Sequence, residues 1–502
     1  MEKSYFSPND FKDASDSRKI QAAINAARDA GLNEVIIPRH NAQKQSTVWT
    51  IDETILLPSH MTVVIDNAHL RMADGVIARM FCNSEADSAL GRTQAGEQTD
   101  IHIVGRGDAL LDGGLPNGLD EFTSLKDGMP HIQMNVTIHL HNVRHFSIEN
   151  LHIRDQRWWA IELLFARDGV ISDVRFELTR HEQDSCARWR NQDGVDLRVG
   201  CSDILIRNIS GETGDDTIAL TALTGPQHEA LQLVEGRDTD IHDVLIQNVR
   251  AVTNMCAIIR LLHQYGNKIY NISMRDIFDV SRPGESNRTQ MVLRLGENGY
   301  HGGNPANMAK PFDMYNITAE NIHSRAMTAI LTACTIKNFH ARDVFVHTDG
   351  GYVWTCGGHN LHMKGDQCFI YLPAREEEAQ RRKVYPGNAG DGLIGENILI
   401  ENVYHTARRA DKPAALCSFN ASRVKNAVVR NVCCEDALPL YTLSNPAGAL
   451  DVRFENVRIA GEALRDERLS ILHKSAQQRG LSPDFIGRKA AFFIRAPAVW
   501  AK

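Results

Sequence analysis

One short pattern recurs along most of this chain and strongly limits how it can fold. Apolar residues alternate over a few positions, an Asn follows, and another apolar residue comes directly after it. The copies end at Asn150, Asn208, Asn248, Asn321, Asn402, Asn431 and Asn456. Asn402 and Asn431 are 29 residues apart and Asn431 and Asn456 are 25 apart, within the roughly 20–30 residues of one β-solenoid coil. Asn208 and Asn248 are 40 apart, which indicates insertions in some coils.

The repeat predicts an all-β fold, a right-handed parallel β-helix. The copies are not joined by a series of two-residue Asn-Gly turns, which would indicate β-hairpins. An Asn at the end of a strand tolerates left-handed backbone and can hydrogen-bond to its counterpart in the next coil. The 502 residues also exceed the usual size of a domain with one compact core, whereas a solenoid grows by repetition.

The two ends of the chain depart from the repeat. Residues 17–31 carry an apolar stripe at helical spacing and end on Gly31, which predicts a helix that caps the first coil. Residues 34–38 then read as a strand. From residue 461 the pattern changes, and the apolar positions Leu464, Leu469, Leu472 and Ala476 favour a partly helical tail. We therefore expect a β-helix with its cap over residues 1–460, and a tail over 461–502 that packs on the solenoid or on a neighbouring subunit.

Composition narrows the functional classes. The net charge is −7 and no block of like charges occurs, which argues against nucleic acid or an anionic membrane as partner. No apolar run reaches the roughly 18 residues of a membrane span, and the first residues show no signal-peptide core. The ten cysteines form no Cys-x-x-Cys pair, so we expect buried free thiols and a cytoplasmic location.

Two acidic clusters carry the functional prediction. They are Asn191-Gln192-Asp193-Gly194 and Gly214-Asp215-Asp216, and Asp193 precedes Asp215 by 22 residues, about one coil. Asp196 lies three residues after Asp193. Residues one coil apart stack on one wall, so the carboxylates would meet there, and crowding lets one of them keep its proton near neutral pH. Inverting hydrolysis of a glycosidic bond needs one protonated and one ionised carboxyl group.

The order of several short motifs between residues 17 and 300 resembles the polygalacturonases, glycoside hydrolase family 28, in the pectate-lyase-like β-helix superfamily. The matching pieces include Arg18-Lys19-Ile20-Gln21-Ala22-Ala23-Ile24, Val104-Gly105-Arg106-Gly107, Leu111-Asp112-Gly113-Gly114, Trp158-Trp159-Ala160-Ile161, Asn191-Gln192-Asp193-Gly194-Val195-Asp196 and Thr213-Gly214-Asp215-Asp216-Thr217.

The resemblance implies a role for each acidic residue. Asp216 would be the general acid, Asp193 and Asp215 would hold and activate the water, and Asn191 and Asp196 would position the site. The reaction would be a single inverting displacement without a covalent intermediate, and it would require no metal and no cofactor.

The chain departs from the family pattern after Asp216. No Gly-His-Gly follows, and the family's Arg-Ile-Lys is replaced by Ile259-Arg260-Leu261-Leu262-His263, with Arg294 one coil further. The family's basic motif grips a uronate carboxylate. Here Arg260, His263 and Arg294 are expected to form a reorganised substrate subsite.

An aromatic pair precedes the acidic clusters. Trp158 and Trp159 are adjacent, and alternation on a strand predicts that one packs in the core while the other stacks on a sugar ring. Trp158 is therefore a candidate substrate-binding residue.

These observations favour a glycoside hydrolase that cleaves an oligosaccharide, with uronate-containing chains among the candidates, while the missing Gly-His-Gly and Arg-Ile-Lys argue against pectin as the substrate. Insertions around residues 177–190 and 221–240 would close one end of the groove, which favours exo-action. Two alternatives stay open on the same fold: a polysaccharide lyase, epimerase or intramolecular glycosyl transferase, and a non-catalytic carbohydrate-binding solenoid. The sequence leaves open whether the chain forms a homo-oligomer.

Overall fold

The computed structural model describes most of the chain, and it divides into two compact units, residues 1–254 and 255–502. The described residues are 4–120, 123–126, 128–179, 191–224, 232–254, 256–282, 289–296, 310, 312–347, 351–356, 390–406, 415–419, 421–443 and 449–471. No helix among them is long and apolar enough to cross a membrane.

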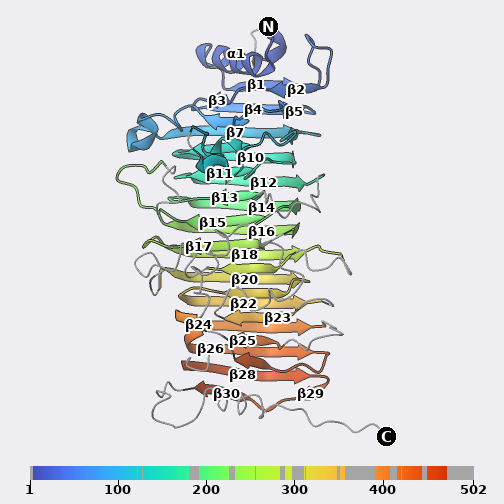
Figure 1. Ribbon diagram of the computed structural model, residues 1–502, viewed down its shortest axis with the longest axis vertical. Coiled ribbons are helices and arrows are strands. Elements are labelled where there is room, and N and C mark those ends of the chain that lie inside the picture. The colour runs from blue at the N-terminus through green and yellow to red at the C-terminus, as the bar shows by residue number, and fades with distance from the viewer. Residues whose placement is uncertain are drawn as a thin grey trace. The chain divides into compact units, whose positions relative to one another are not determined.

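The first unit is a parallel β-helix built from a sheet of long strands and a sheet of short strands (Figure 1). The sheet of long strands contains β1 (Glu34–Pro38), β2 (Val48–Ile51), β4 (Met61–Asp66), β5 (His69–Met72), β7 (Gln98–Arg106), β8 (Leu110–Asp112), β10 (Val143–Arg154), β12 (Arg167–Glu177), β14 (Ser202–Thr213) and β16 (Ile241–Thr253). The sheet of short strands contains β3 (Ile55–Leu57), β6 (Phe81–Asn83), β9 (Ile138–His141), β11 (Ile161–Leu164), β13 (Val195–Leu197) and β15 (Ile218–Ala222). The pairings recorded between these strands are parallel, as the repeat predicts.

The second unit repeats the arrangement. Its long strands are β18 (Ile269–Asp279), β20 (Met314–Ser324), β22 (Ile336–Val346), β24 (Gly390–His405), β26 (Ala421–Cys434) and β28 (Ala449–Ile459). Its short strands are β17 (Ala257–His263), β19 (Met291–Leu295), β21 (Thr328–Thr332), β23 (Tyr352–Cys356), β25 (Cys417–Phe419) and β27 (Tyr441–Leu443). These strands pair in parallel within each sheet. The prediction of a right-handed parallel β-helix is confirmed.

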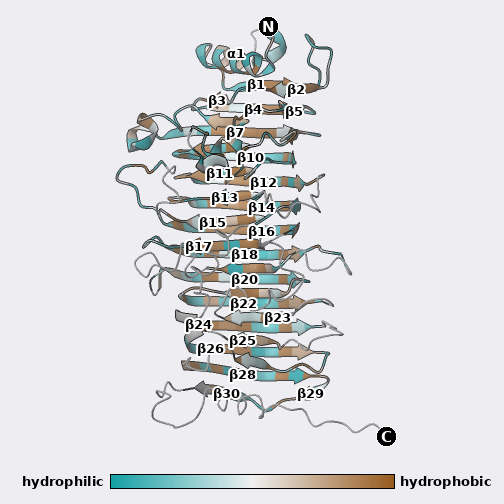
Figure 2. Cartoon of the chain, in the orientation of Figure 1, coloured by the Kyte–Doolittle hydropathy of each residue, from teal (hydrophilic) through white to brown (hydrophobic). Residues whose placement is uncertain are grey.

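Hydrophobic residues recur along the strands (Figure 2), and those in register are buried in the interior of the coils. In the first unit Ile148, Ile171, Ile206 and Ile246 occupy equivalent positions on β10, β12, β14 and β16, and all four are fully buried. Burying one such side chain stabilises the fold by about 1.5–3 kcal/mol relative to leaving it in water. Stacking of identical residues therefore supplies the core that the long chain needs.

The Asn residues that end the repeats have the left-handed backbone that the sequence predicts, and several bond to their counterparts in the next coil. Asn208, Asn248, Asn402 and Asn431 all have positive φ, between 51° and 56°, where Asn is tolerated better than other side chains. The amide of Asn248 donates to the side-chain oxygen of Asn208 at 2.9 Å, and that of Asn431 donates to Asn402 at 3.1 Å. We call these stacked Asn residues the Asn ladder. They bend the long strands at the same point in successive coils.

The N-terminal cap is also confirmed. Helix α1 (Asp16–Asp29) begins after the N-cap Ser15, whose hydroxyl accepts from the backbone N–H of Arg18 at 3.2 Å. It ends just before Gly31, which has a φ of +70°. Its apolar stripe (Ile20, Ala23, Ile24 and Ala27) is fully buried against the first strands. The 3₁₀ helices η1 (Pro8–Asp10), η2 (Leu90–Arg92), η3 (Gln94–Gly96), η4 (Thr123–Leu125) and η5 (Ile132–Asn135) complete the helical elements of the described chain.

The prediction of a helix in the tail is wrong for its described part. Residues after 460 form β29 (Glu462–Ala463) and β30 (Glu467–Ile471), which pair antiparallel with β28. Leu469 is buried in β30 opposite Val452. An antiparallel return covers the free edge of the last long strand, which a helix would leave unpaired. Leu472 and Ala476 lie outside the described residues.

The cysteines follow the expectation of free thiols. The eight cysteines that the structure describes form no disulfide with one another, and all except Cys433 are buried. Cys186 and Cys368 lie outside the described residues.

Candidate active site

The two acidic clusters lie on neighbouring coils of the first unit, in the turns that lead into β13 and β15. The backbone N–H of Gly194 donates to the carbonyl of Asp216 at 3.0 Å, continuing the parallel pairing of these strands. The spacing in the sequence predicts Asp193 beside Asp215. The observed register is one residue longer and places Asp193 beside Asp216.

Buried hydroxyl groups fix the turn that carries the second cluster. The hydroxyls of Thr213 and Thr253 both donate to the backbone carbonyl of Asp215, at 2.8 and 2.5 Å. The Thr213 hydroxyl also lies 3.0 Å from that of Thr217. The backbone between Asp215 and Asp216 is therefore held on both sides of the turn.

The first cluster is held by a pair of side-chain amides. The amide of Gln192 donates to the carbonyl of Gln156 at 2.6 Å, and the amide of Gln156 donates back to the carbonyl of Gln192 at 3.2 Å. This exchange ties the segment with Asn191 and Asp193 to the preceding coil. Asn191 is half-buried, and Asp193 is buried.

Asp196 is the carboxyl group whose protonation the structure perturbs most clearly. It is fully buried on β13, and burial raises its pKa well above the ordinary value of an aspartic acid. The charge of Arg198 opposes this shift, while the carboxylates of Glu162 and Asp216 add to it. A hydrogen bond with the side chain of Asp193 also opposes the rise in the pKa of Asp196. The structure therefore brings Asp193, Asp196 and Asp216 together, and the group that favours its protonated form is Asp196.

The prediction that one tryptophan faces a sugar is not supported by the packing. Trp158 and Trp159 are 5% and 7% exposed and stack on each other at 3.8 Å. They belong to an apolar cluster with Leu119, Ile132 and Val136. Both lie in the turn before β11 and not on the strand, so the alternation of strand residues does not separate them.

The predicted basic residues lie in the second unit. Arg260 and Arg294 occupy equivalent positions on β17 and β19, and Arg294 donates to the sulfur of Cys256 at 2.6 Å. His263 is buried, and burial lowers its pKa to about 3, so its ring is neutral near neutral pH. Their roles in substrate binding stay predictions.

Three residues of the site were not predicted from the sequence. Glu162 on β11 lies in register with Asp196 on β13 and with His139 on β9. The guanidinium of Arg198 lies 4.6 Å from the centre of the Trp159 ring, and its charge acts on both Glu162 and Asp196. The available signal was a charged residue between apolar neighbours, Ile161-Glu162-Leu163, in a strand that must be buried.

Two segments cover the N-terminal part of the sheet of short strands, and we call them the covering segments (residues 84–97 and 232–237). The amide of Gln232 donates to Asp87 at 2.9 Å, and the guanidinium of Arg237 reaches Glu97 at 2.6 Å. The backbone carbonyl of Gln232 also lies 2.5 Å from a ring nitrogen of His141 on β9. Residues far apart in the sequence therefore meet beside β9.

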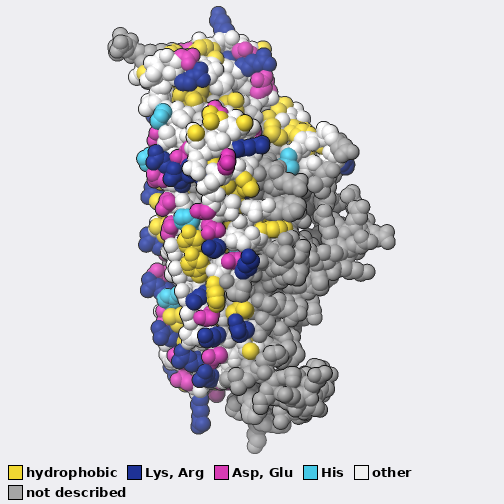
Figure 3. All heavy atoms as spheres, turned by 90° about the vertical axis from the view of Figure 1, so that its left-hand side faces the viewer, with side chains coloured by type: hydrophobic (Ala, Val, Ile, Leu, Met, Phe, Trp, Pro, Cys, Tyr) yellow, Lys and Arg dark blue, Asp and Glu magenta, His cyan; other side chains and the backbone are white. Residues whose placement is uncertain are grey.

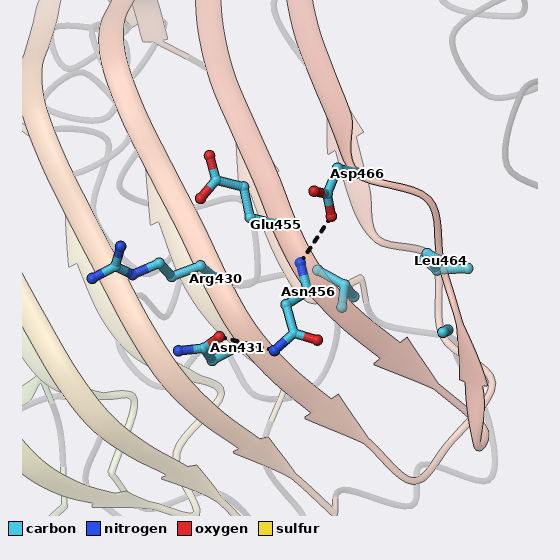
Figure 4. Close-up of a pocket in the computed structure, with 8 residues that line it drawn as sticks. Arg430, Asn431, Glu455, Asn456, Leu464 and Asp466 are labelled. Carbon is cyan, nitrogen blue, oxygen red and sulfur yellow. Dashed lines mark hydrogen bonds between the residues drawn. The ribbon is translucent and has the colours of Figure 1, made fainter.

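Two surface pockets of the described chain lie elsewhere. One, of about 430 Å³, lies where the tail folds back on β28, with Asn456 bonded to Asn431 and to Asp466 (Figure 4). The other, of about 730 Å³, lies along β7, β10, β12, β14 and β16. Neither is lined by a predicted catalytic residue. Basic and acidic side chains are interspersed on the face that Figure 3 shows, as the sequence predicts.

Comparison with known proteins supports the predicted resemblance. The model of the family "Glycosyl hydrolases family 28" matches residues 93–236, which include both acidic clusters. Comparison with curated proteins by sequence finds no match.

Solved structures with a similar fold include a tailspike protein of the E. coli bacteriophage HK620 in complex with a pentasaccharide. It has a TM-score of 0.51 and 12% identity, over 91% of this chain and 79% of that chain. An exopolygalacturonase from Thermotoga maritima has a TM-score of 0.44 and 12% identity, over 92% and 93%. A polygalacturonase from Erwinia carotovora has a TM-score of 0.39 and 13% identity, over 89% and 95%. At these identities the likeness concerns the fold alone.

Proposed function

We propose that this chain is a glycoside hydrolase that cleaves an oligosaccharide with inversion of configuration. Asp216 protonates the leaving oxygen, and Asp193 with Asp215 activates the attacking water. The observation that carries the proposal is the meeting of Asp193, Asp196 and Asp216 on adjacent coils, inside the stretch that matches the glycosyl hydrolase family.

The chemistry fits a crowded group of carboxyl groups. Inversion takes one step, in which a carboxylic acid gives its proton to the leaving group while a carboxylate removes a proton from water on the opposite side of the sugar. Like charges that are close together resist simultaneous ionisation. Such a group can hold a proton near neutral pH, and the proposal requires Asp216 to carry one when the substrate binds.

We further propose exo-action. The covering segments meet beside β9 through the contacts of Gln232 with Asp87 and of Arg237 with Glu97, and in this proposal they close one end of the substrate groove. A chain that can enter from one side only presents its terminal sugars to the carboxylates. Arg260 and Arg294 are proposed to select an acidic sugar, because adjacent guanidinium groups recognise carboxylates.

The experiment is a screen of the purified protein on neutral and uronate-containing oligosaccharides, with the anomeric configuration of the first product followed by NMR. The proposal expects a saturated product of inverted configuration, released one unit at a time from oligosaccharides labelled at one end. Retained configuration would refute inversion. An unsaturated, ultraviolet-absorbing product would instead identify a lyase, and an isomerised sugar without cleavage would identify an epimerase.

Matched variants test the assignment of the acid. Asp216→Asn removes the proposed donor and is expected to lower kcat by about 10²–10⁴-fold. Asp203→Asn is the control: Asp203 is exposed on β14 and has a φ of 55°, which Asn also adopts readily. Equal activity of Asp216→Asn and wild type would exclude Asp216 as the acid, and absence of turnover on every substrate would favour a binding protein.

A further inference from the structure

A row of polar side chains crosses the sheet of short strands beside the proposed site, and we call it the polar row. It consists of Cys82 on β6, His139 on β9, Glu162 on β11 and Asp196 on β13, each in register with the next. None is more than 3% exposed. Ionisable residues are almost never buried this completely unless they are paired, so the charges in the row need partners.

Glu162 has such partners on both oxygens. A ring nitrogen of His139 lies 2.7 Å from one oxygen, and the amide of Gln133 donates to the other at 2.9 Å. Burial alone would raise the pKa of Glu162, but His139, the charge of Arg198 and the Gln133 amide together lower it. Glu162 is therefore an anion fixed in one orientation.

Asp196 has the opposite environment on the next strand. Among the described residues, neither of its carboxyl oxygens has a well-formed hydrogen bond to the protein, although the side chain of Asp193 is close. Arg198 is the cation that faces it, and Arg198 also faces Glu162. Strands in register are about 4.8 Å apart, so the anion of Glu162 acts on Asp196 at close range.

We propose that Glu162 is a positioning residue of the site, whose fixed negative charge keeps Asp196 protonated so that Asp196 can donate a hydrogen bond to Asp193. Asp193 then stays ionised and oriented toward the attacking water. The catalytic role of Glu162 depends on the proposed function, but the protonation of Asp196 can be measured without a substrate.

Other charged and titratable groups also face Glu162 and must be considered in any pH experiment. They are His139 on β9, Asp196 and Arg198 at β13, His131 before η5, and Arg79 and Cys82 near β6. Burial lowers the pKa of both histidines and raises that of Cys82 to about 12. Near neutral pH the two histidines therefore stay uncharged and Cys82 stays a thiol.

The substrate-free experiment is a double-mutant cycle on stability across pH, with wild type, Glu162→Gln, Asp196→Asn and the double variant. A carboxyl group with a raised pKa contributes stability that is complete below its unfolded pKa and is lost as pH rises toward its folded pKa. The wild type should therefore lose stability relative to Asp196→Asn as pH rises above about 4. Glu162→Gln should end this loss at a lower pH, because removing the neighbouring anion lowers the pKa of Asp196.

Two controls separate this effect from a general loss of structure. The first is the choice of Gln at position 162, because its side chain can still accept a hydrogen bond from His139, and the amide of Gln133 can turn to match it. Glu149→Gln removes a carboxylate from the outer face of β10, which among the described residues accepts one weak bond, from Ser172 at 3.3 Å. This variant should leave the difference between wild type and Asp196→Asn unchanged at every pH. Parallel pH curves for wild type and Asp196→Asn would overturn the proposal.

The kinetic experiment follows once a substrate is known. The alkaline limb of the pH profile of kcat should move to lower pH in Glu162→Gln, and this movement should vanish when Asp196 is Asn. A fall in kcat with an unmoved limb would mean that Glu162 acts only on structure. If no substrate is turned over, the proposed function fails while the stability cycle still decides the protonation of Asp196.

Discussion

Gly194 makes the first acidic cluster possible, and replacing it with Ala tests the packing on which the site depends. A Cβ on Gly194 would lie 2.5 Å from the carbonyl oxygen of Thr217 and 2.8 Å from the ring of Phe176. An ordinary contact of this kind is longer than about 3.4 Å. The Thr217 carbonyl cannot move freely, because it accepts the backbone N–H of Val195 at 3.0 Å in the pairing of β13 with β15.

The overlap therefore has to be relieved by shifting one coil against the next. Inserting a methyl group into a packed site typically costs about 1–3 kcal/mol. The shift falls on the segment that holds Asp193, and a displacement of about 1 Å in a reacting group can lower the rate by about 10²-fold. We expect Gly194→Ala to fold with a free energy of unfolding reduced by that amount and with kcat reduced by about two orders of magnitude.

Denaturant unfolding and steady-state kinetics measure the two effects on the same preparation. Gly395→Ala is the matched control, because Gly395 is buried in β24 with its nearest neighbour 3.7 Å from the added Cβ. That variant should keep or gain about 0.4–1 kcal/mol through the smaller entropy of its unfolded chain. Wild-type stability and kcat in Gly194→Ala would refute the close approach of the two coils.

Further predictions concern the scaffold. Asn431→Ala removes a side chain that bonds to Asn402 at 3.1 Å and to Asn456 at 2.9 Å, and it places Ala at a φ of 56°. We expect the free energy of unfolding, measured in urea, to fall by about 1–3 kcal/mol. Asn431→Gly should lose less, because Gly adopts this φ without strain. Asp112 has a pKa well below its usual range, since bonds from His69 and Arg154 outweigh the effect of burial. Its contribution to stability is present above the unfolded pKa and is lost as pH falls toward the folded one, so the gap in thermal midpoint between wild type and Asp112→Asn should shrink on acidification.

The repeat predicted the fold because its chemistry is specific to one place in the coil. Left-handed backbone at a bend admits few side chains, so Asn431 and its counterparts mark the same bend each time. The capping helix was predicted as well, because a clear apolar stripe at helical spacing ends at Gly31. The tail was predicted wrongly, because the spacing of Leu464 and Leu469 is compatible both with a helix and with the antiparallel strand that covers β28.

The site was predicted in part for the same reason. Asp193 and Asp216 stand in short turn motifs whose spacing is close to one coil, so local sequence was sufficient to bring them together. The error of one residue in register arose because turn lengths are not fixed by strand periodicity. Glu162 was not predicted, because its partners come from other coils. Gln133 precedes β9, and Arg198 follows β13.

The energetics of the polar row argue that it serves the site and not the fold. Taking an ion out of water costs several kcal/mol even in a relaxed protein, and a buried ion pair often stabilises no better than apolar residues of the same volume. On the same two strands, Ile161 and Val195 lie in register and are fully buried without any such cost. A sheet of this kind therefore has no structural need for Glu162 beside Asp196. Replacing the pair with apolar residues should leave the β-helix folded, and what it should remove is control over the proton next to Asp193.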